Sequence, residues 1–185
     1  MTIESTKLKD CFIIHDTVFG DHRGYFFESF NKKKFYAETG IQTDFVQDNQ
    51  SRSQKGVLRG LHFQKGEFAQ SKLVRVLEGK VLDVAVDLRK HSPTFGQHVS
   101  IELSDDSHTQ FYVPRGFAHG FVVLSETATF FYKCDNYYHK AAEGGIIYND
   151  PELGIDWKLP EEDLLLSEKD RLLTTLQTSF NELVF

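Results

Sequence analysis

Residues 72–88, KLVRVLEGKVLDVAVDL, carry the clearest structural signal in the chain. Within residues 82–88, leucine and valine occupy the even positions, whereas Asp83, an alanine and Asp87 occupy the odd ones. Successive side chains of a β-strand point to opposite faces, so this alternation predicts a strand with one apolar and one more polar face. A second apolar run precedes the segment LEGK, and this arrangement predicts a hairpin because Gly79 can adopt the positive φ of a tight turn.

Comparable runs rich in Val, Ile, Phe, Tyr and Thr recur along the chain at spacings of roughly 8–12 residues, which is typical of antiparallel sandwiches and barrels. Two short helices are expected between them. Asn31 and Gly40 have the residue types of an N-cap and a C-terminal stop. Near the other end, Ser167 stands three residues before Asp170, as in a capping box, and predicts a helix toward residues 171–180.

Composition bounds the kinds of protein that this chain can be. Its 185 residues are 40% hydrophobic and 14% aromatic, with no linker-like or repeated segment, so we expect one domain covering residues 1–185. A net charge of -6 argues against general nucleic-acid binding, although a small anionic ligand remains possible. No apolar run suits a membrane span or a secretory signal, and a cytoplasmic location is expected. Cys11 and Cys134 are expected to be buried, inert thiols.

Two motifs contain the histidines of greatest interest. In residues 56–64, GVLRGLHFQ, a glycine precedes His62 by six residues, and residues 113–121, VPRGFAHGF, place His119 in the pattern P-x-G-x-x-H. These resemble the two sequence motifs of the cupin superfamily. That resemblance implies a jelly-roll barrel of antiparallel strands, with functional groups inside the barrel and a few short helices outside it, including one near the C-terminus.

His62 could be a core residue, a metal ligand or a base. Metal-binding cupins supply His-x-His and then Glu in the first motif, but here Gln64 holds the second histidine position, and glutamine is a poor replacement for imidazole. We therefore expect no metal site. Further polar side chains in the neighbouring strand-like segments favour a polar guest in the barrel over a packed interior. These side chains are Arg59, Lys72, Arg75 and His119.

Eight segments in order resemble the dTDP-4-dehydrorhamnose 3,5-epimerase family, and together they cover nearly the whole chain. They are residues 21–30, 45–64, 69–89, 92–96, 113–126, 132–146, 149–157 and 166–170. The resemblance implies a cofactor-independent isomerase that acts on a dTDP-4-keto-6-deoxy sugar, whose C3 and C5 hydrogens are acidified by the C4 carbonyl. A base removes such a proton, an enolate forms, and an acid returns a proton to the opposite face.

Four catalytic roles follow from the resemblance. His62 matches the base and Asp170 the carboxylate that would orient it, as in a catalytic triad. Lys72 matches the cation beside the enolate oxygen, and Tyr132 matches the acid on the opposite face of the sugar. The residues alone leave blander alternatives open, because Asp170 suits the first turn of a helix and Lys72 suits an exposed strand edge.

The resemblance also implies substrate-binding residues and a homodimer. The cations suit a pyrophosphate, and an aromatic ring suits the thymine. A segment that contains Phe19 and Phe26 would reach into the neighbouring subunit's site. The implied binding residues are Arg23, Phe26, Glu28, Gln47, Asn49, Arg59, Lys72, His119, Tyr138, Glu143 and Lys169.

Rival functions and one geometric problem remain open. A related enzyme could invert one carbon only or take another nucleotide 4-keto sugar, and a metal-dependent cupin enzyme or an inert sugar-binding module is a more distant alternative. Strict alternation puts Arg59 and His62 on opposite faces of one strand. If both contact the substrate, the strand must bulge or twist near Gly60.

Overall fold

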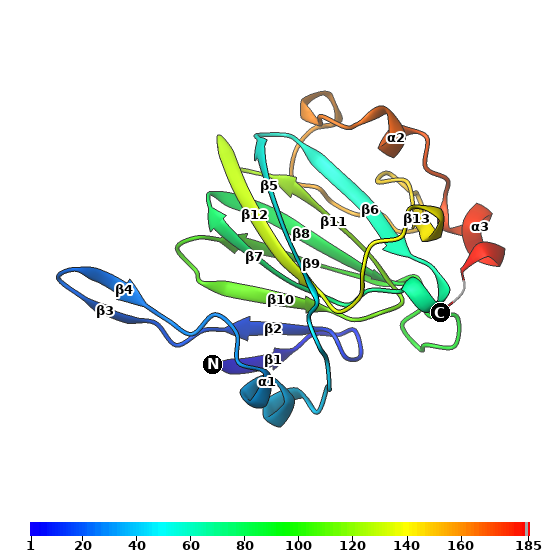
Figure 1. The fold of residues 1–185 in the computed structure, drawn as a ribbon. Coiled ribbons are helices and arrows are strands. Elements are labelled where there is room, and N and C mark those ends of the chain that lie inside the picture. Colours follow the sequence, from blue (N-terminus) through cyan, green and yellow to red (C-terminus); the bar gives the residue numbers. More distant parts are fainter. Residues whose placement is uncertain (184) are drawn as a thin grey trace.

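The computed structural model describes residues 1–183 and 185, and its main body consists of two facing antiparallel sheets (Figure 1). The six-stranded sheet has the order β1-β2-β10-β7-β12-β5, and the five-stranded sheet has the order β13-β6-β11-β8-β9. A separate pair, β3 and β4, forms a hairpin. This mainly β architecture with short helices confirms the predicted fold class.

The strands of the first sheet are β1 (Thr2–Ser5), β2 (Phe12–His15), β10 (Thr109–Val113), β7 (Lys72–Glu78), β12 (Thr127–Cys134) and β5 (Gln47–Gln54). Those of the second are β13 (Glu143–Gly145), β6 (Leu58–Gln64), β11 (Phe117–Val123), β8 (Lys80–Asp87) and β9 (His98–Ser104), while β3 is Phe19–Asp21 and β4 is Gly24–Phe26. The α-helices are α1 (Lys32–Thr39), α2 (Glu168–Arg171) and α3 (Leu176–Ser179). Single 3₁₀ turns are η1 (Gly66–Phe68), η2 (Lys140–Ala142), η3 (Glu161–Asp163) and η4 (Phe180–Glu182). No helix among the described residues has the length and apolar character needed to cross a membrane.

The segment of residues 72–88 folds as two strands, but the predicted hairpin is wrong. Strand β7 pairs with β10 and β12 in one sheet, whereas β8 pairs with β11 and β9 in the other. Gly79 has φ +83 as expected, and a Cβ there would lie 2.1 Å from the carbonyl oxygen of Thr127. The glycine therefore turns the chain from one sheet into the facing one, because β7 and β8 each form hydrogen bonds with two other strands and not with each other.

Both faces of β8 are buried, which explains its two kinds of residue. The even positions, including Leu82 and Val84, pack in a cluster with Trp157 beneath the C-terminal segment. Val81 and Ala85 at odd positions belong to a second cluster between the sheets. The more polar face thus points into the barrel and not to solvent, and this is where Asp83 and Asp87 lie with no exposed surface.

Strand β6 contains the irregularity that its two functional residues require. His62 lies opposite His119 on β11, whereas Arg59 lies opposite Phe121, so three steps on β6 match two on β11. Gly60 occupies this register shift with φ +130, a conformation that side-chain-bearing residues rarely adopt. The predicted bulge at Gly60 is confirmed.

Helix α1 begins and ends as predicted. The Asn31 side chain accepts a hydrogen bond from the backbone N–H of Lys34, and Gly40 closes the helix with φ 70. The C-terminal prediction is only partly right. Ser167 accepts from the N–H of Asp170 at 3.1 Å, but α2 ends after one turn, and a second cap at Thr175 starts α3.

The C-terminal helix divides because tertiary contacts hold the chain between its two parts. The carbonyl oxygen of Thr174 accepts a hydrogen bond from the N–H of Ile147 at 2.9 Å, and the N–H of Leu176 donates to Asp150 at 2.6 Å. A continuous helix would withdraw Thr174 and Leu176 from these partners. The helical pattern of residues 171–180 is therefore overridden by packing against residues 146–150.

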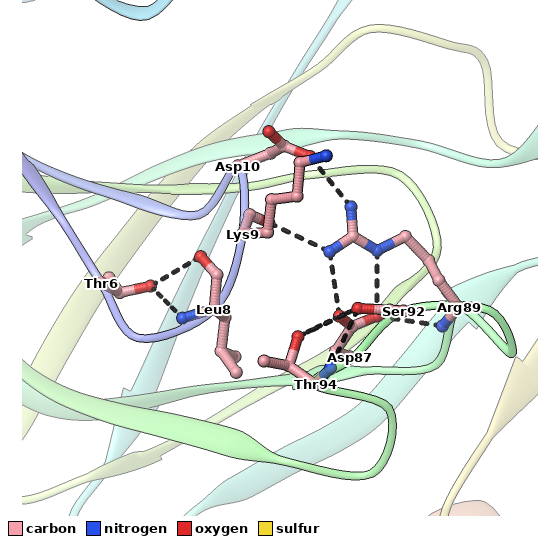
Figure 2. Close-up of polar contacts among 8 residues, drawn as sticks. All are labelled: Thr6, Leu8, Lys9, Asp10, Asp87, Arg89, Ser92 and Thr94. Carbon is pink, nitrogen blue, oxygen red and sulfur yellow. Dashed lines mark hydrogen bonds and ion pairs between the residues drawn. The ribbon is translucent and has the colours of Figure 1, made fainter.

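Asp87 is the centre of a polar network that fastens an N-terminal loop to the barrel (Figure 2). Its carboxylate accepts hydrogen bonds from Arg89, from Ser92 Oγ at 2.6 Å and from Thr94 Oγ1 at 2.7 Å. Arg89 also donates to Asp10 at 3.1 Å. A buried carboxylate with several donors is satisfied without a ligand, so Asp87 has a structural explanation.

The β3–β4 hairpin projects away from the barrel (Figure 1). Its aromatic rings are exposed, with Phe19 at 64% and Phe26 at 70%. At its base the guanidinium of Arg75 lies 5.7 Å from the centroid of the Phe27 ring and 5.4 Å from that of Phe131. Arg75 therefore contacts the base of the hairpin, and its expected place beside His62 is wrong because alternation on β7 turns it to the other face from Lys72.

Candidate active site

A cavity of about 670 Å³ opens between the two sheets, with walls from strands of both and from the segment of residues 165–170. A smaller cavity of about 270 Å³ adjoins it. Asn49, His62, Lys72 and Tyr132 line both spaces and so mark their junction. Three of the four residues expected to be catalytic thus meet at one place, and the fourth, Asp170, lines the larger cavity.

His62 and Asp170 form a close pair. The Nε2 atom of His62 lies 2.6 Å from Oδ1 of Asp170, whose side chain is 5% exposed. Burial raises the pKa of the Asp170 carboxyl, but hydrogen bonds and charge from His62, together with Ser167 and Lys169, outweigh burial and hold it below its usual value. An ionised Asp170 that accepts from Nε2–H leaves Nδ1 of a neutral His62 free to accept a proton.

Lys72 and Tyr132 come from neighbouring strands on the same side of one sheet. Lys72 lies opposite Cys134 in the β7–β12 register, and its Nζ is 5.8 Å from the centroid of the Tyr132 ring. Burial lowers the pKa of Lys72, and Cys134, Asp83 and Glu143 oppose that effect. Burial raises the pKa of Tyr132, which favours the protonated phenol that a general acid requires.

His119 forms a second histidine–carboxylate pair beside the first. Its Nε2 lies 2.8 and 3.0 Å from the two oxygens of Asp83, which is fully buried on the adjacent strand β8. Burial lowers the pKa of His119, and the attraction of Asp83 does not overcome it. Asp83 was missed as a site residue in the sequence, although an acid inside an apolar strand was the available signal.

Arg59 reaches across the barrel toward the other sheet. Its Nε and Nη2 donate to Ser53 Oγ on β5 at 3.3 and 3.2 Å, and the Gly60 bulge lets both Arg59 and His62 line the larger cavity. Ser53 was also missed, since one serine in a polar strand carries no distinctive pattern. Arg59 is therefore available to an anionic part of a ligand.

The smaller cavity contains an exposed aromatic ring and a linked set of polar groups. The hydroxyl of Tyr138 donates to Glu143 at 2.9 Å, and Lys169 Nζ lies 2.5 Å from the same carboxylate. The Gln47 side chain accepts from the backbone N–H of Tyr138 at 3.1 Å and donates to Asn49 at 3.0 Å. Tyr138 is 51% exposed, which suits stacking on a planar ring.

Comparison with known proteins shows the family to which the chain belongs. The family model described as dTDP-4-dehydrorhamnose 3,5-epimerase matches residues 5–178. The chain belongs to the dTDP-4-dehydrorhamnose 3,5-epimerase family. A curated member from Salmonella typhimurium is 54% identical over 173 residues, covering 92% of each chain.

Solved structures of family members share the whole fold. The enzyme from Elizabethkingia anophelis is 60% identical with a TM-score of 0.94, and the match covers 96% of this chain and 97% of that one. A dTDP-6-deoxy-D-glucose-3,5-epimerase from Legionella pneumophila, solved in complex with dTDP-4-keto-L-rhamnose, is 51% identical with a TM-score of 0.95 over 99% and 96% of the two chains. The recognition drawn from the eight sequence segments is thereby confirmed.

Three residues that the epimerase resemblance assigns to substrate lie outside the two cavities around His62. Arg23 and Phe26 stand on the projecting hairpin, where Arg23 pairs with Asp21 at 2.5 Å and its side chain is 79% exposed. Glu28 pairs with Lys34 at 2.8 Å near α1. None of the three residues lines either cavity at His62.

The geometry at Gln64 bears on the metal question. The Gln64 side chain accepts a hydrogen bond from the backbone N–H of His139 at 2.9 Å and is buried. Among residues 1–183 and 185, no group of three or more His, Cys, Asp or Glu side chains is arranged to hold a metal ion. His62 and His119 are instead each engaged by a carboxylate.

Proposed function

We propose that this chain converts dTDP-4-dehydro-6-deoxy-D-glucose to dTDP-4-dehydro-L-rhamnose by inverting C3 and C5, as an isomerase of dTDP-L-rhamnose biosynthesis. Membership of the epimerase family supports the activity. The observation that carries the assignment to this site is the 2.6 Å His62–Asp170 pair in a cavity that Lys72 and Tyr132 also line. A base, an acid and a cation around one space are what an enolate mechanism needs.

In the proposed reaction, Nδ1 of His62 takes the proton from C5 or C3, and the electron pair of that C–H bond moves toward the C4 oxygen to give an enolate. The imidazolium that results is stabilised by Asp170. The ammonium of Lys72 stabilises the enolate oxygen, where negative charge develops. The phenol of Tyr132 then protonates the carbon from the opposite face, which inverts it.

The cycle closes by proton transfer alone. After inversion, His62 holds one extra proton and Tyr132 lacks one, so exchange with water restores both groups. No electron is lost or gained by the sugar, and we accordingly propose that the enzyme needs no redox cofactor and no metal. The same base and acid would serve the second carbon after the sugar ring shifts in the cavity.

The substrate would occupy both cavities. We assign the thymine to the exposed face of Tyr138 and the sugar to the junction at His62, Lys72 and Tyr132. The pyrophosphate would be bound by cations, among which Arg59 lines the larger cavity and Lys169 stands beside Glu143. Gln47 and Asn49 are then available to polar edges of the nucleoside, and His119 to the sugar.

We further propose a homodimer in which the β3–β4 hairpin of each subunit completes the partner's site. Each subunit would be one domain of residues 1–185. The support is the projection of the hairpin (Figure 1), the exposure of Phe19 and Phe26, and the absence of Arg23 from the lining of the two cavities at His62. The proposed partners are the sugar nucleotide and a second copy of the chain, with neither nucleic acid nor membrane, and the proposed location is the cytoplasm.

Solvent exchange tests the function directly. Wild-type protein incubated with dTDP-4-dehydro-6-deoxy-D-glucose in D2O should yield the L-rhamno product with deuterium at both C3 and C5, read by NMR and mass spectrometry. His62→Asn should lower the rate by about 10³-fold or more with the fold intact. Deuterium at one carbon only would identify a mono-epimerase, and exchange at neither carbon would refute the proposed activity.

A further inference from the structure

The role of Asp83 is not explained by the reaction scheme. It is a fully buried carboxylate on β8, and the hydrogen bonds of its side chain among the described residues go to His119 alone. Burying an ionised carboxylate inside a barrel costs free energy unless the carboxylate is paired, so the presence of Asp83 at this position requires an explanation. Both of its oxygens lie within hydrogen-bond distance of Nε2 of His119.

The contact determines which nitrogen of His119 carries the proton. A carboxylate accepts but does not donate, so the ring must place its proton on Nε2 when it is neutral. Burial lowers the pKa of His119, and the nearby positive charges of Lys72 and, when protonated, His62 lower it further, while Asp83 opposes them. The balance favours a neutral ring whose Nδ1 is a hydrogen-bond acceptor.

The Nδ1 atom has no protein partner among residues 1–183 and 185. His119 is one of the residues that line the larger cavity. His119 lies opposite His62 in the β6–β11 register. Its free acceptor is thus presented at the end of the cavity where the reacting sugar would lie.

We propose that Asp83 is a positioning residue that locks His119 as the Nε2–H tautomer, so that Nδ1 accepts a hydrogen bond from a hydroxyl group of the sugar. The proposal rests on the proposed function for the identity of the ligand. It gives the two histidine–carboxylate pairs opposite tasks: with Asp170, His62 is prepared to gain a proton, whereas with Asp83, His119 is held neutral to bind.

The tautomer can be tested in the wild-type protein without any substrate. In protein labelled with ¹⁵N-histidine, the His119 signals, identified by their loss in His119→Gln, should show a protonated Nε2 and a bare Nδ1. A proton on Nδ1 would overturn the proposal. This measurement stands even if the protein proves to have a different substrate.

Ligand affinity tests the second half of the proposal. Asp83→Asn can present either an acceptor or a donor to the ring, so the tautomer is no longer fixed. Affinity for dTDP-L-rhamnose should fall about tenfold, whereas affinity for dTDP, which lacks the sugar, should stay within about twofold. Asp83→Glu should restore part of the loss because the carboxylate is kept.

Asp87→Asn is the matched control, since it removes the other buried carboxylate of β8 but leaves His119 untouched. It should lower stability without changing the His119 signals or the affinity for dTDP-L-rhamnose. Equal loss of affinity for both ligands in Asp83→Asn would indicate general damage to the barrel and refute the assigned role. If wild-type protein fails to epimerise the 4-keto sugar yet shows the predicted tautomer, the proposed function fails and the positioning role stands.

Discussion

Nε2 of His62 lies 2.6 Å from Oδ1 of Asp170, although the two residues are 108 positions apart in the chain. Strand β6 supplies the histidine, and the single turn of α2 supplies the carboxylate. The backbone N–H of Asp170 donates a hydrogen bond to Ser167 Oγ. Asp170 therefore caps nothing with its own side chain. The two interpretations of Asp170 are compatible, because its backbone serves the helix and its carboxylate serves the histidine.

Asp170→Asn should lower kcat about 10³-fold with a much smaller change in KM. An asparagine keeps the shape but does not stabilise the imidazolium, and it can force the wrong tautomer on His62. Steady-state kinetics with the 4-keto sugar nucleotide would measure the loss. The neighbouring Glu168→Gln, exposed on the same turn, should leave the rate unchanged, and an equal loss there would point to disruption of α2.

Tyr132→Phe should separate proton abstraction from inversion. His62 can still remove a proton and return one from solvent on the same face, so deuterium should enter recovered substrate while epimerised product falls by about 10²-fold or more. The ratio of exchange to turnover, measured by NMR in D2O, is the relevant quantity. Tyr36→Phe, on the exposed surface of α1, is the control. If exchange and inversion fell equally, Tyr132 would not be the acid.

Mixing two inactive variants should test the exchange of hairpins between subunits. A heterodimer of Arg23→Ala and His62→Asn contains one site in which the wild-type histidine of one chain meets the wild-type arginine of the other. Equal amounts of the two variants would be unfolded and refolded together. If the chains assort at random, half of the dimers are heterodimers with one intact site each, so total activity should reach up to about a quarter of the wild-type value. A mixture of His62→Asn with Tyr132→Phe should recover nothing, because each residue lines its own chain's cavity and each of the two sites in the heterodimer would keep one defect.

Gly60→Ala should damage both stability and catalysis. With φ +130, a Cβ on residue 60 would lie 2.6 Å from Gly120 Cα and 2.9 Å from the His119 carbonyl oxygen. We expect a loss of roughly 2–4 kcal/mol in the free energy of unfolding, measured in urea, and a lower kcat because His62 and Arg59 no longer share the cavity.

Gly24→Ala is a matched control for the stability effect of Gly60→Ala. Gly24 has a similar φ of +134 but no heavy atom within 4 Å of the added Cβ. Its substitution should lower the free energy of unfolding only through backbone strain, because the added Cβ meets no neighbouring atom. Equal destabilisation by the two variants would show that the close approach of β6 and β11 is not the reason for the glycine.

Asp87→Asn should lower the free energy of unfolding by about 3 kcal/mol, because Arg89 loses its buried partner (Figure 2). The variant should also lose less of its free energy of unfolding than the wild type does as the pH is lowered. Burial raises the pKa of Asp87, but hydrogen bonds from Arg89, Ser92 and Thr94 outweigh burial and hold it below its ordinary value of 3.8.

The sign of that pH effect follows from proton uptake. Below the ordinary pKa the unfolded carboxyl binds a proton that the folded one does not, so the stabilisation by Asp87 is complete above about pH 5 and is lost as pH falls through the folded pKa. Urea titrations between pH 3 and pH 7 should show a shallower slope in the variant. An exposed carboxylate changed in the same way, Asp106→Asn, should leave the slope as it is in wild type.

The sequence by itself determined the local features. Alternation at residues 82–88 predicted a strand, Asn31 and Gly40 marked the ends of α1, and the three-residue spacing of Arg59 and His62 required a bulge at Gly60. These three predictions are correct because φ preferences, helix caps and strand periodicity depend on residues that are neighbours in the chain. The eight family segments added the site residues, which no local rule could assign.

Only the tertiary structure decided which elements meet. Asp83 and Asp87 have the same position in the alternation, yet one holds His119 and the other holds Arg89. Strands β7 and β8, joined by one glycine, belong to opposite sheets. The physical reason is that periodicity sets the face on which a side chain lies, whereas its partner is set by long-range pairing and burial, which join groups as distant as His62 and Asp170.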